Sequence, residues 1–226
     1  QGVTVVDDLI HGEVTFKNEE IADFIIMKSD GFPTYNFACV IDDWLMGITH
    51  VLRADEHLSN TPRQMMIYRA LSAPMPKFGH VPMILAPDRS KLSKRHGAQT
   101  VEEFMEKGYL PEAIVNYLAL LGWTPPDATK EFMTLEEMVE EFDLSRVSST
   151  PAIYDVQKLT WMNGQYMKRL DVDDLVSRYI PFAVRYGLGT KETLSEKREF
   201  LRGVVTSLRE RAKTLEELAE MSEFYF

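Results

Sequence analysis

The chain contains two adjoining segments of opposite character, His80-Val81-Pro82-Met83-Ile84-Leu85-Ala86-Pro87-Asp88 and Lys91-Leu92-Ser93-Lys94-Arg95-His96-Gly97. The first predicts a short apolar strand that ends at a Pro-Asp turn. The second gathers cationic donors on one short loop, where a serine and a glycine let a polyanion approach closely. In open α/β sheets ligands bind at the carboxyl ends of the strands. The order therefore predicts an α/β fold with a phosphate-binding loop at that edge.

The basic loop has two interpretations. Lys91 and Lys94 can stabilise charge that develops on a leaving phosphate, and Ser93 lies between them as a further polar contact. Taken alone, a basic run of five residues is more often a solvated loop than a catalytic one. The position directly after a predicted strand favours phosphate binding.

The composition is that of an ordinary globular protein, with 226 residues of which 45% are hydrophobic and 27% are charged. This length suffices for one large domain or two small ones. No run approaches the roughly 20 apolar residues that span a bilayer, and the first residues carry no targeting signal. The single cysteine, Cys39, excludes an internal disulfide, and no Cys/His spacing is typical of zinc. We therefore expect no metal site and a reducing, cytoplasmic location.

The formal net charge of −10 argues against indiscriminate binding to nucleic acid, because such binding needs many cations on phosphates. The charge is unevenly distributed along the sequence. The cations of the basic loop are clustered, whereas acidic runs such as Glu136-Glu137 lie far from them in the chain. A local basic face for selective docking remains possible.

Segments before the basic loop alternate between predicted strands and helices. Alternating apolar and polar residues predict strands at 3–6, 13–16 and 24–27 and a further strand at 48–53. A helix is expected from Tyr35 to Asp43, with Phe37 and Ile41 in the core. Another helix starts near Pro62 and continues to Leu71. Helix, strand, helix, strand and basic loop make up half of a doubly wound α/β domain.

The sequence after Gly97 is predicted to be helical. Thr100-Val101-Glu102-Glu103 is a capping-box pattern, residues 111–121 are strongly amphipathic, and a further helix opens at Thr134. A helix over 156–164 is expected to stop at Gly164. The charged segment from Asp173 onward has apolar positions spaced i, i+4, i+8 at Phe200, Val204 and Leu208.

Longer motifs accompany the basic loop. They are Asp30-Gly31-Phe32-Pro33-Thr34-Tyr35-Asn36-Phe37-Ala38, Met46-Gly47-Ile48-Thr49-His50-Val51-Leu52-Arg53, Asp55-Glu56-His57-Leu58-Ser59-Asn60-Thr61-Pro62-Arg63-Gln64 and Trp161-Met162-Asn163-Gly164. The basic loop resembles the lysine-serine-lysine signature of class I aminoacyl-tRNA synthetases. The set resembles bacterial glutamyl-tRNA synthetases over essentially the whole chain.

This resemblance implies a ligase of protein biosynthesis that uses ATP and Mg²⁺. Such an enzyme activates glutamate to glutamyl-adenylate and transfers it to the 3′ end of tRNA(Glu). Lys91 and Lys94 would be catalytic, neutralising the pyrophosphate leaving group. The family's positions for ATP binding correspond to Lys91, Ser93, Lys94, Glu56, His57, Met83 and Ile84. Those for the glutamate pocket correspond to Tyr35, Cys39 and Arg53, where relatives can carry a polar amide in place of the cysteine.

Each implied role has a simpler structural alternative. Tyr35 can be a half-buried core tyrosine, and Arg53 a strand-end arginine in a surface pair. Glu56 can cap the next helix, and His57 can simply pack. Met83 and Ile84 are expected in the core in either case, because binding through the backbone leaves their side chains free to be buried. Trp161 is expected to be a core aromatic rather than an RNA-stacking surface.

The resemblance also implies a division of the chain. Residues 1–30 would end an acceptor-binding insertion, 31–97 would form the second half of a Rossmann-type parallel-sheet domain, 98–170 a helical stem-contact region, and 171–226 the start of a helical anticodon-binding domain. The family's histidine-rich ATP motif is absent from this sequence. We therefore expect a fragment that is inactive alone. We also expect a monomer. The alternatives are a non-catalytic tRNA-binding or assembly module and a paralogue that glutamylates a modified tRNA base, which the helical continuation disfavours.

Overall fold

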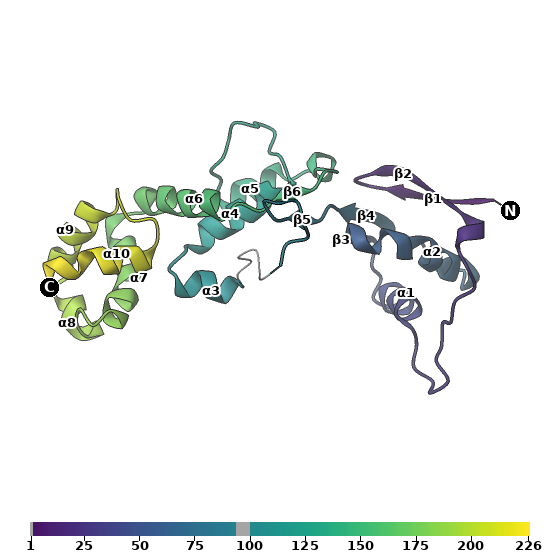
Figure 1. The fold of residues 1–226 in the computed structure, drawn as a ribbon, viewed down its shortest axis with the longest axis horizontal. Coiled ribbons are helices and arrows are strands. Elements are labelled where there is room, and N and C mark those ends of the chain that lie inside the picture. The colour runs from purple at the N-terminus through teal and green to yellow at the C-terminus, as the bar shows by residue number, and fades with distance from the viewer. Residues whose placement is uncertain (1, 94–99) are drawn as a thin grey trace. The chain divides into compact units, whose positions relative to one another are not determined.

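The computed structural model describes residues 2–93 and 100–226 (Figure 1). The chain divides into two compact units. Unit 1 comprises Gln1–Ile84, Gly122–Pro126 and Phe142–Ala152. Unit 2 comprises Leu85–Leu121, Asp127–Glu141 and Ile153–Phe226. Residues Lys94 to Gly97 of the basic loop, and with them the predicted site residue Lys94, lie outside the described residues.

Unit 1 is built on a four-stranded mixed sheet. Its strands are β1 (Val3–Asp8), β2 (Gly12–Lys17), β3 (His50–Ala54) and β4 (Lys77–Val81), in the spatial order β2-β1-β4-β3. β1 and β2 form an antiparallel hairpin, whereas β1 and β3 both run parallel to β4. The predicted α/β class with parallel pairing is confirmed. Parallel pairing brings the carboxyl ends of β1, β3 and β4 to one edge.

Two helices supply the core of unit 1, α1 (Tyr35–Leu45) and α2 (Thr61–Ala70). Along β1 the buried residues alternate with exposed ones, so one face of the hairpin strand is covered and the other is open. The shared apolar cluster joins both helices to β1 and β4 through Val6, Val40, Met65, Ile67, Tyr68 and Phe78. Phe37 packs against this cluster while only partly buried. The predicted order of helix, strand, helix and strand is therefore confirmed.

Two predictions fail in unit 1. Residues 24–27 form only an isolated bridge, between Met27 and Pro33, because a tight turn follows at once: Gly31 N donates to Lys28 O at 3.0 Å. The predicted strand over 80–88 is also wrong in extent. β4 ends at Val81, since Pro82 has no backbone N–H to give to a ladder. A separate two-residue strand, β5 (Ile84–Leu85), follows and pairs with β6 (Ala152–Ile153).

Unit 2 is almost entirely helical. Its helices are α3 (Val101–Glu106), α4 (Pro111–Gly122), α5 (Leu135–Glu141), α6 (Val156–Arg169), α7 (Val172–Arg185), α8 (Lys191–Glu196), α9 (Arg198–Leu208) and α10 (Leu215–Ser222). One apolar cluster includes Phe104 of α3, Tyr117 of α4 and Met162 of α6. A second includes Tyr179 of α7, Val205 of α9 and Leu218 of α10. In each cluster the helices pack through apolar side chains spaced three to four residues apart, which lie on one face of a helix.

Polar residues begin these helices as the sequence predicts. Thr100 caps α3 in a capping box with Glu103, whose carboxylate accepts from the Thr100 amide at 2.9 Å. Thr134 and Glu137 make the same reciprocal pair ahead of α5, at 3.2 and 2.8 Å. These contacts satisfy amide groups that the first turn of a helix leaves without partners.

Three helical predictions are corrected. α6 does not stop at Gly164, which lies inside it. A Cβ there would come within 3.0 Å of Lys213 Cδ, so glycine permits a close approach. In α9 the buried face is shared by Leu201, Val204 and Leu208, whereas Phe200 is 43% exposed. Trp161 is 39% exposed and is therefore not a core residue. No helix of the described residues is both long and apolar enough to cross a membrane.

We predict that Gly108→Ala destabilises unit 2 by about 2 kcal/mol or more. Gly108 has φ of +78°, and a Cβ there would lie 2.7 Å from the Leu215 backbone nitrogen, which donates to Gly108 O at 3.0 Å. Both the backbone conformation and the contact therefore oppose a side chain. Urea unfolding of the two proteins measures the difference.

Gly203→Ala is the matched control. Gly203 lies on the exposed side of α9, with open space where a Cβ would be. We expect a gain of roughly 0.5–1 kcal/mol, because alanine favours the helix. Equal effects of the two substitutions would contradict the packing described around Gly108.

Candidate functional site

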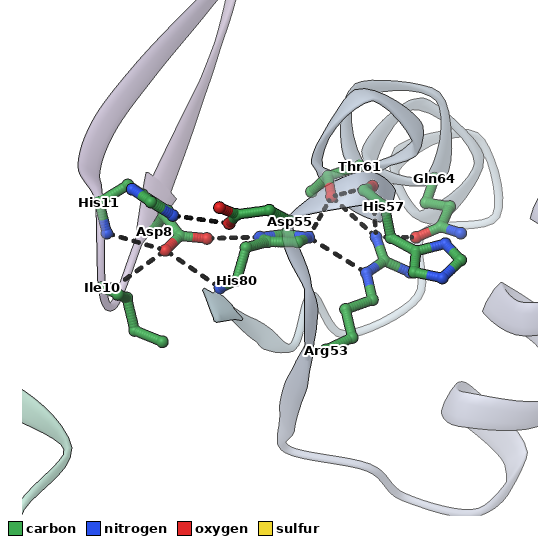
Figure 2. Close-up of polar contacts among 9 residues, drawn as sticks. All are labelled: Asp8, Ile10, His11, Arg53, Asp55, His57, Thr61, Gln64 and His80. Atoms are coloured by element: carbon green, nitrogen blue, oxygen red, sulfur yellow. Dashed lines mark hydrogen bonds and ion pairs between the residues drawn. The ribbon is translucent and has the colours of Figure 1, made fainter. Parts of the chain in front are cut away.

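Arg53 occupies the centre of a polar network at the carboxyl edge of the unit 1 sheet (Figure 2). It is the fourth residue of β3, directly across from His80 of β4. Its Nε donates to His80 Nε2 at 3.1 Å. Its Nη2 donates to Thr61 Oγ1 and to Gln64 Oε1, both at 2.8 Å, from the first turns of α2. The guanidinium is thus held between a strand and a helix.

Asp8 and His80 form a fully buried pair behind Arg53. His80 Nδ1 lies 2.6 Å from Asp8 Oδ2, and neither side chain is exposed. The other carboxylate oxygen, Oδ1, accepts from the backbone amides of Ile10, His11 and His80 at 3.0 to 3.2 Å. Figure 2 shows the resulting line of contacts from the turn after β1, through His80, to Arg53. Such a buried carboxylate is tolerated because both of its oxygens are hydrogen-bonded.

Burial and hydrogen bonds set the charge states of this pair. Burial raises the pKa of Asp8, but the hydrogen bonds from His80 and from backbone amides outweigh it and hold the pKa below its usual value. Burial lowers the pKa of His80 more than its bond to Asp8 raises it. The charge on Arg53 lowers the pKa of His80 further. The favoured state is therefore a charged Asp8 beside a neutral imidazole.

A second contact joins the same two parts of unit 1. His11 Nε2, in the turn after β1, lies 2.7 Å from Asp55 Oδ1, the first residue of a 3₁₀ turn over Asp55–Asn60. Both side chains are partly exposed, unlike the pair formed by Asp8 and His80. The hairpin is thus tied to the sheet edge at two separate places.

The predicted glutamate-pocket residues Tyr35, Cys39 and Arg53 come together in unit 1. Tyr35 and Cys39 lie one turn apart on α1, so they share a face. Burial and then contact with Cys39 raise the pKa of Tyr35, whereas the nearby Arg53 lowers it. The Tyr35 hydroxyl also lies 3.2 Å from His57 Nδ1. The residue is 51% exposed, which excludes a core role.

Other ionisable groups face Arg53 from the helices. Burial raises the pKa of the Asp43 carboxyl, while Arg53 lowers it. Burial, together with the nearby Asp43 and Cys39, raises the pKa of Tyr68 to about 12. The Tyr68 hydroxyl therefore remains protonated at neutral pH. Arg53 thus interacts electrostatically with the Asp43 carboxyl and with the phenols of Tyr35 and Tyr68.

The remaining candidates in unit 1 are more exposed than the sequence suggests. Glu56 is exposed in the 3₁₀ turn, and His57 is half-buried beside Tyr35. Met83 and Ile84 are 37% and 38% exposed, so the prediction that both are core residues is wrong. They lie in the short segment between Pro82 and the basic loop. The strand β5 in this segment pairs only with β6, so its side chains are less covered than those of a strand inside a larger sheet.

The described part of the basic loop belongs to unit 2. The predicted Pro-Asp turn is present: Asp88 Oδ1 accepts from the amide and the hydroxyl of Ser90, at 2.9 and 2.7 Å. Leu85 and Lys91 then form an antiparallel bridge. Leu92 packs against the apolar cluster of α3, α4 and α6, which fixes the start of the loop. Lys91 is exposed and Ser93 is half-buried.

The network around Asp8 is what the sequence analysis missed. Asp8 ends an alternating strand and His80 lies within an apolar run, so neither stands in a motif of its own. One signal was available, since Asp8 follows Thr4 and Val6 on the covered face of β1. A charged residue at a buried position needs a partner.

In residues 2–93 and 100–226 no group of three or more His, Cys, Asp or Glu residues can hold a metal ion.

A family profile and individual relatives of this chain point to the same protein family. A family profile described as "tRNA synthetases class I (E and Q), catalytic domain" matches residues 1–161. The chain is 55% identical over 226 residues to glutamate–tRNA ligase 1 of Caldanaerobacter subterraneus subsp. tengcongensis. It is 54% identical over 225 residues to the glutamate–tRNA ligase of Moorella thermoacetica. Each match covers the whole chain and 46% of the relative, so the chain spans about half the length of these curated relatives.

The fold is also similar to solved structures. A glutamate–tRNA ligase from Elizabethkingia meningosepticum, crystallised in complex with its amino acid, superimposes with a TM-score of 0.89 at 30% identity. A glutamate–tRNA synthetase from Elizabethkingia anophelis superimposes with a TM-score of 0.88 at the same identity. Both comparisons cover all of this chain and about half of the solved one, 47% and 48%.

We predict that stability falls as the pH decreases below about 6.5, the pKa of an unfolded histidine. Because the pKa of His80 is lowered in the fold, the unfolded state binds a proton first. The stabilisation is complete above the unfolded pKa and is lost as the pH falls toward the folded one. One such group gives a slope of at most about 1.4 kcal/mol per pH unit.

Urea unfolding at a series of pH values between 7 and 5 measures this slope. In His80→Gln the contribution should disappear, because glutamine does not titrate. A wild-type slope retained in the variant would show that a different group is responsible.

Proposed function

This chain belongs to the class I tRNA synthetase (E and Q) family by its catalytic domain, and on that basis we propose that the whole protein is a glutamate–tRNA ligase. Its substrates would be glutamate, ATP and tRNA(Glu). The observation that carries the proposal is the grouping of Tyr35, Cys39 and Arg53 beside the carboxyl edge of a parallel sheet. That edge is where α/β folds bind their ligands.

The proposed first step is the formation of glutamyl-adenylate. A carboxylate oxygen of glutamate attacks the α-phosphorus of ATP in line. A new O–P bond forms as the bond from the α-phosphorus to the bridging oxygen breaks, and pyrophosphate leaves. In the second step a 3′-terminal hydroxyl of tRNA attacks the activated carbonyl carbon, its proton is lost, and AMP leaves. The protein contributes positioning and charge stabilisation to both steps.

Arg53 would hold a carboxylate of the substrate. A guanidinium fixed by His80, Thr61 and Gln64 cannot swing away, so the ligand meets a preorganised donor. Tyr35 is exposed and protonated at neutral pH, which suits a neutral hydrogen-bonding role at the pocket wall. Cys39 would line the same wall, where a thiol donates a weaker hydrogen bond than an amide.

Lys91, Ser93 and Lys94 would act on the phosphates of ATP. The two lysines would neutralise negative charge on departing pyrophosphate, which accumulates only as the P–O bond breaks. Glu56 and His57 would contact ATP, and the backbone of Met83 and Ile84 would meet adenine. Mg²⁺ supplies further charge neutralisation when bound. It would enter with the ATP phosphates.

We further propose a role for each segment of the chain. Residues 1–30 would end an acceptor-binding insertion, although β1 shares the sheet with β4 in this structure. Residues 31–97 would belong to the catalytic domain, 98–170 would contact the tRNA stem, and 171–226 would begin the anticodon-binding region. We propose that the protein acts as a cytoplasmic monomer.

The test of this proposal is glutamate-dependent exchange of labelled pyrophosphate into ATP. It should be measured on the intact gene product, after its mass has been compared with that of this 226-residue chain. An active, longer product would support the proposal. We expect the 226 residues alone to be inactive. A natural 226-residue protein without exchange would instead favour a tRNA-binding or assembly module.

Within the intact gene product, we predict that Lys94→Ala reduces pyrophosphate exchange by about 100-fold or more, the typical loss for a charge-stabilising donor. The affinity for tRNA should change by less than about threefold, because a single phosphate contact contributes little to a large interface. Exchange kinetics and filter binding give the two values.

Lys77→Ala, at the start of β4, is the control and should change neither value, since Lys77 is an exposed residue at the end of the strand away from the carboxyl edge. If Lys94→Ala retained exchange but lost tRNA binding, the loop would serve docking rather than catalysis.

A further inference from the structure

We infer that Asp8 and His80 are positioning residues for the substrate-binding arginine, Arg53. They fix the imidazole tautomer that accepts from Arg53 Nε and thereby leave one guanidinium nitrogen, Nη1, for the ligand carboxylate. The inference rests on the proposed function, which makes glutamate the ligand. Neither Asp8 nor His80 would touch the substrate.

The tautomer follows from donor and acceptor chemistry. An arginine side chain has only donors, so His80 Nε2 must offer its lone pair to Arg53 Nε–H at 3.1 Å. A neutral imidazole then carries its proton on Nδ1. That proton points to Asp8 Oδ2 at 2.6 Å, and a carboxylate can only accept. Both ends of the ring are therefore satisfied by one tautomer and by no other.

Thr61 completes the arrangement around the ring. Its hydroxyl oxygen lies 3.1 Å from His80 Nε2 and accepts from Arg53 Nη2 at 2.8 Å. The hydroxyl proton is then free to point to His80 Nε2 or to the carbonyl of His57, 3.4 Å away. The two atoms that accept from Arg53, Thr61 Oγ1 of α2 and His80 Nε2 of β4, are therefore also within hydrogen-bond distance of each other.

The contacts with His80, Thr61 and Gln64 determine which nitrogen of the Arg53 guanidinium faces the ligand. Nε donates to His80, and Nη2 donates to Thr61 and Gln64 at 2.8 Å and, more weakly at 3.4 Å, to the carbonyl of His57. Gln64 is itself held, since its Nε2 donates to Asn36 Oδ1 at 3.1 Å. The hydrogen bonds that hold Arg53 to β4 and to α2 therefore use Nε and Nη2 and leave out Nη1. A ligand carboxylate would therefore be met by Nη1, with Arg53 in one fixed orientation.

The hydrogen bonds of Asp8 explain why it can fix the tautomer of His80. Three backbone amides hold Asp8 Oδ1, two of them from the turn that follows β1. The turn after β1 thus orients the carboxylate independently of its contact with the His80 imidazole. A change at Asp8 would act on Arg53 only through the imidazole, because no direct contact joins the two residues in the described structure.

Asp8→Asn is the substitution that separates positioning from packing. Asparagine has the same size, and its oxygen can keep the three backbone contacts. Its NH₂ group would then face His80 Nδ1 and require that nitrogen to accept. The proton would move to Nε2, where it opposes Arg53 Nε–H, a donor against a donor.

The experiment uses the intact gene product and compares Asp8→Asn, His80→Gln and His11→Ala. Pyrophosphate exchange gives KM for glutamate and for ATP. We expect Asp8→Asn to raise KM for glutamate by about 10- to 100-fold and to change KM for ATP by less than about threefold. His80→Gln should restore much of the glutamate affinity relative to Asp8→Asn, because its amide oxygen can accept from Arg53 Nε.

His11→Ala is the structural control. It removes the other tie between the hairpin and the sheet edge, the 2.7 Å contact with Asp55, without touching Arg53. KM for glutamate should remain within about threefold of wild type in this variant. Equal losses in His11→Ala and Asp8→Asn would overturn the inference, since a general loosening of the hairpin would then explain both.

Nitrogen-15 NMR of labelled histidine and arginine gives a readout that does not depend on activity. The wild type should show the proton of His80 on Nδ1 and a hydrogen-bonded Arg53 Nε–H. Asp8→Asn should move the histidine proton to Nε2 and shift the Arg53 signal. An unchanged tautomer in a folded variant would overturn the inference.

The two proposals fail differently. A wild-type gene product without glutamate-dependent exchange would refute the proposed function. The tautomer and the Arg53 signal would then still decide whether Asp8 and His80 position Arg53. Exchange that is active in wild type, with an unchanged KM for glutamate in Asp8→Asn, would refute the positioning role alone.

Discussion

The contact on which the first unit depends is the buried hydrogen bond between Asp8 and His80. A carboxylate without solvent is costly unless all of its oxygens are bonded, and here the turn after β1 and the imidazole satisfy both. The bond joins the hairpin to the parallel strands where β1 and β4 share only a short register. Replacing either partner alone would leave a buried polar group without its counterpart, which costs more than the contact contributes.

The parallel arrangement turns this structural bond into part of a site. Because β1, β3 and β4 point in one direction, their last residues meet at one edge, and helix α2 begins beside them. The first turn of α2 supplies Thr61 and Gln64 to Arg53. If Arg53 binds the substrate as proposed, stability and ligand recognition draw on the same few atoms. This coupling explains why a polar cluster occupies a position that packing alone would fill with apolar side chains.

Local patterns were sufficient to predict most elements of unit 1 and the order of its helices and strands from α1 to β4. Capping pairs such as Thr100 with Glu103, and the proline at the start of α2, have local causes that one sequence reveals. Two of the failures are tertiary in origin. Gly164 reads as a stop but admits a close neighbour. The bond between Asp8 and His80 joins residues 72 positions apart, and no local pattern encodes such a pairing. The roles of Tyr35, Cys39 and Arg53 came from resemblance rather than from periodicity.

The placement of β3 has a practical consequence for handling this chain. β3 is the last strand in the sheet order of the described residues, so one side of it is not paired within that sheet. Leu45 and Met46, just before it in the chain, are each 74% exposed, and Leu52 within it is 51% exposed. An open strand edge beside apolar side chains is a template for self-association. The shelf life of a concentrated preparation would thus depend on this edge, despite the solubility that a net charge of −10 confers.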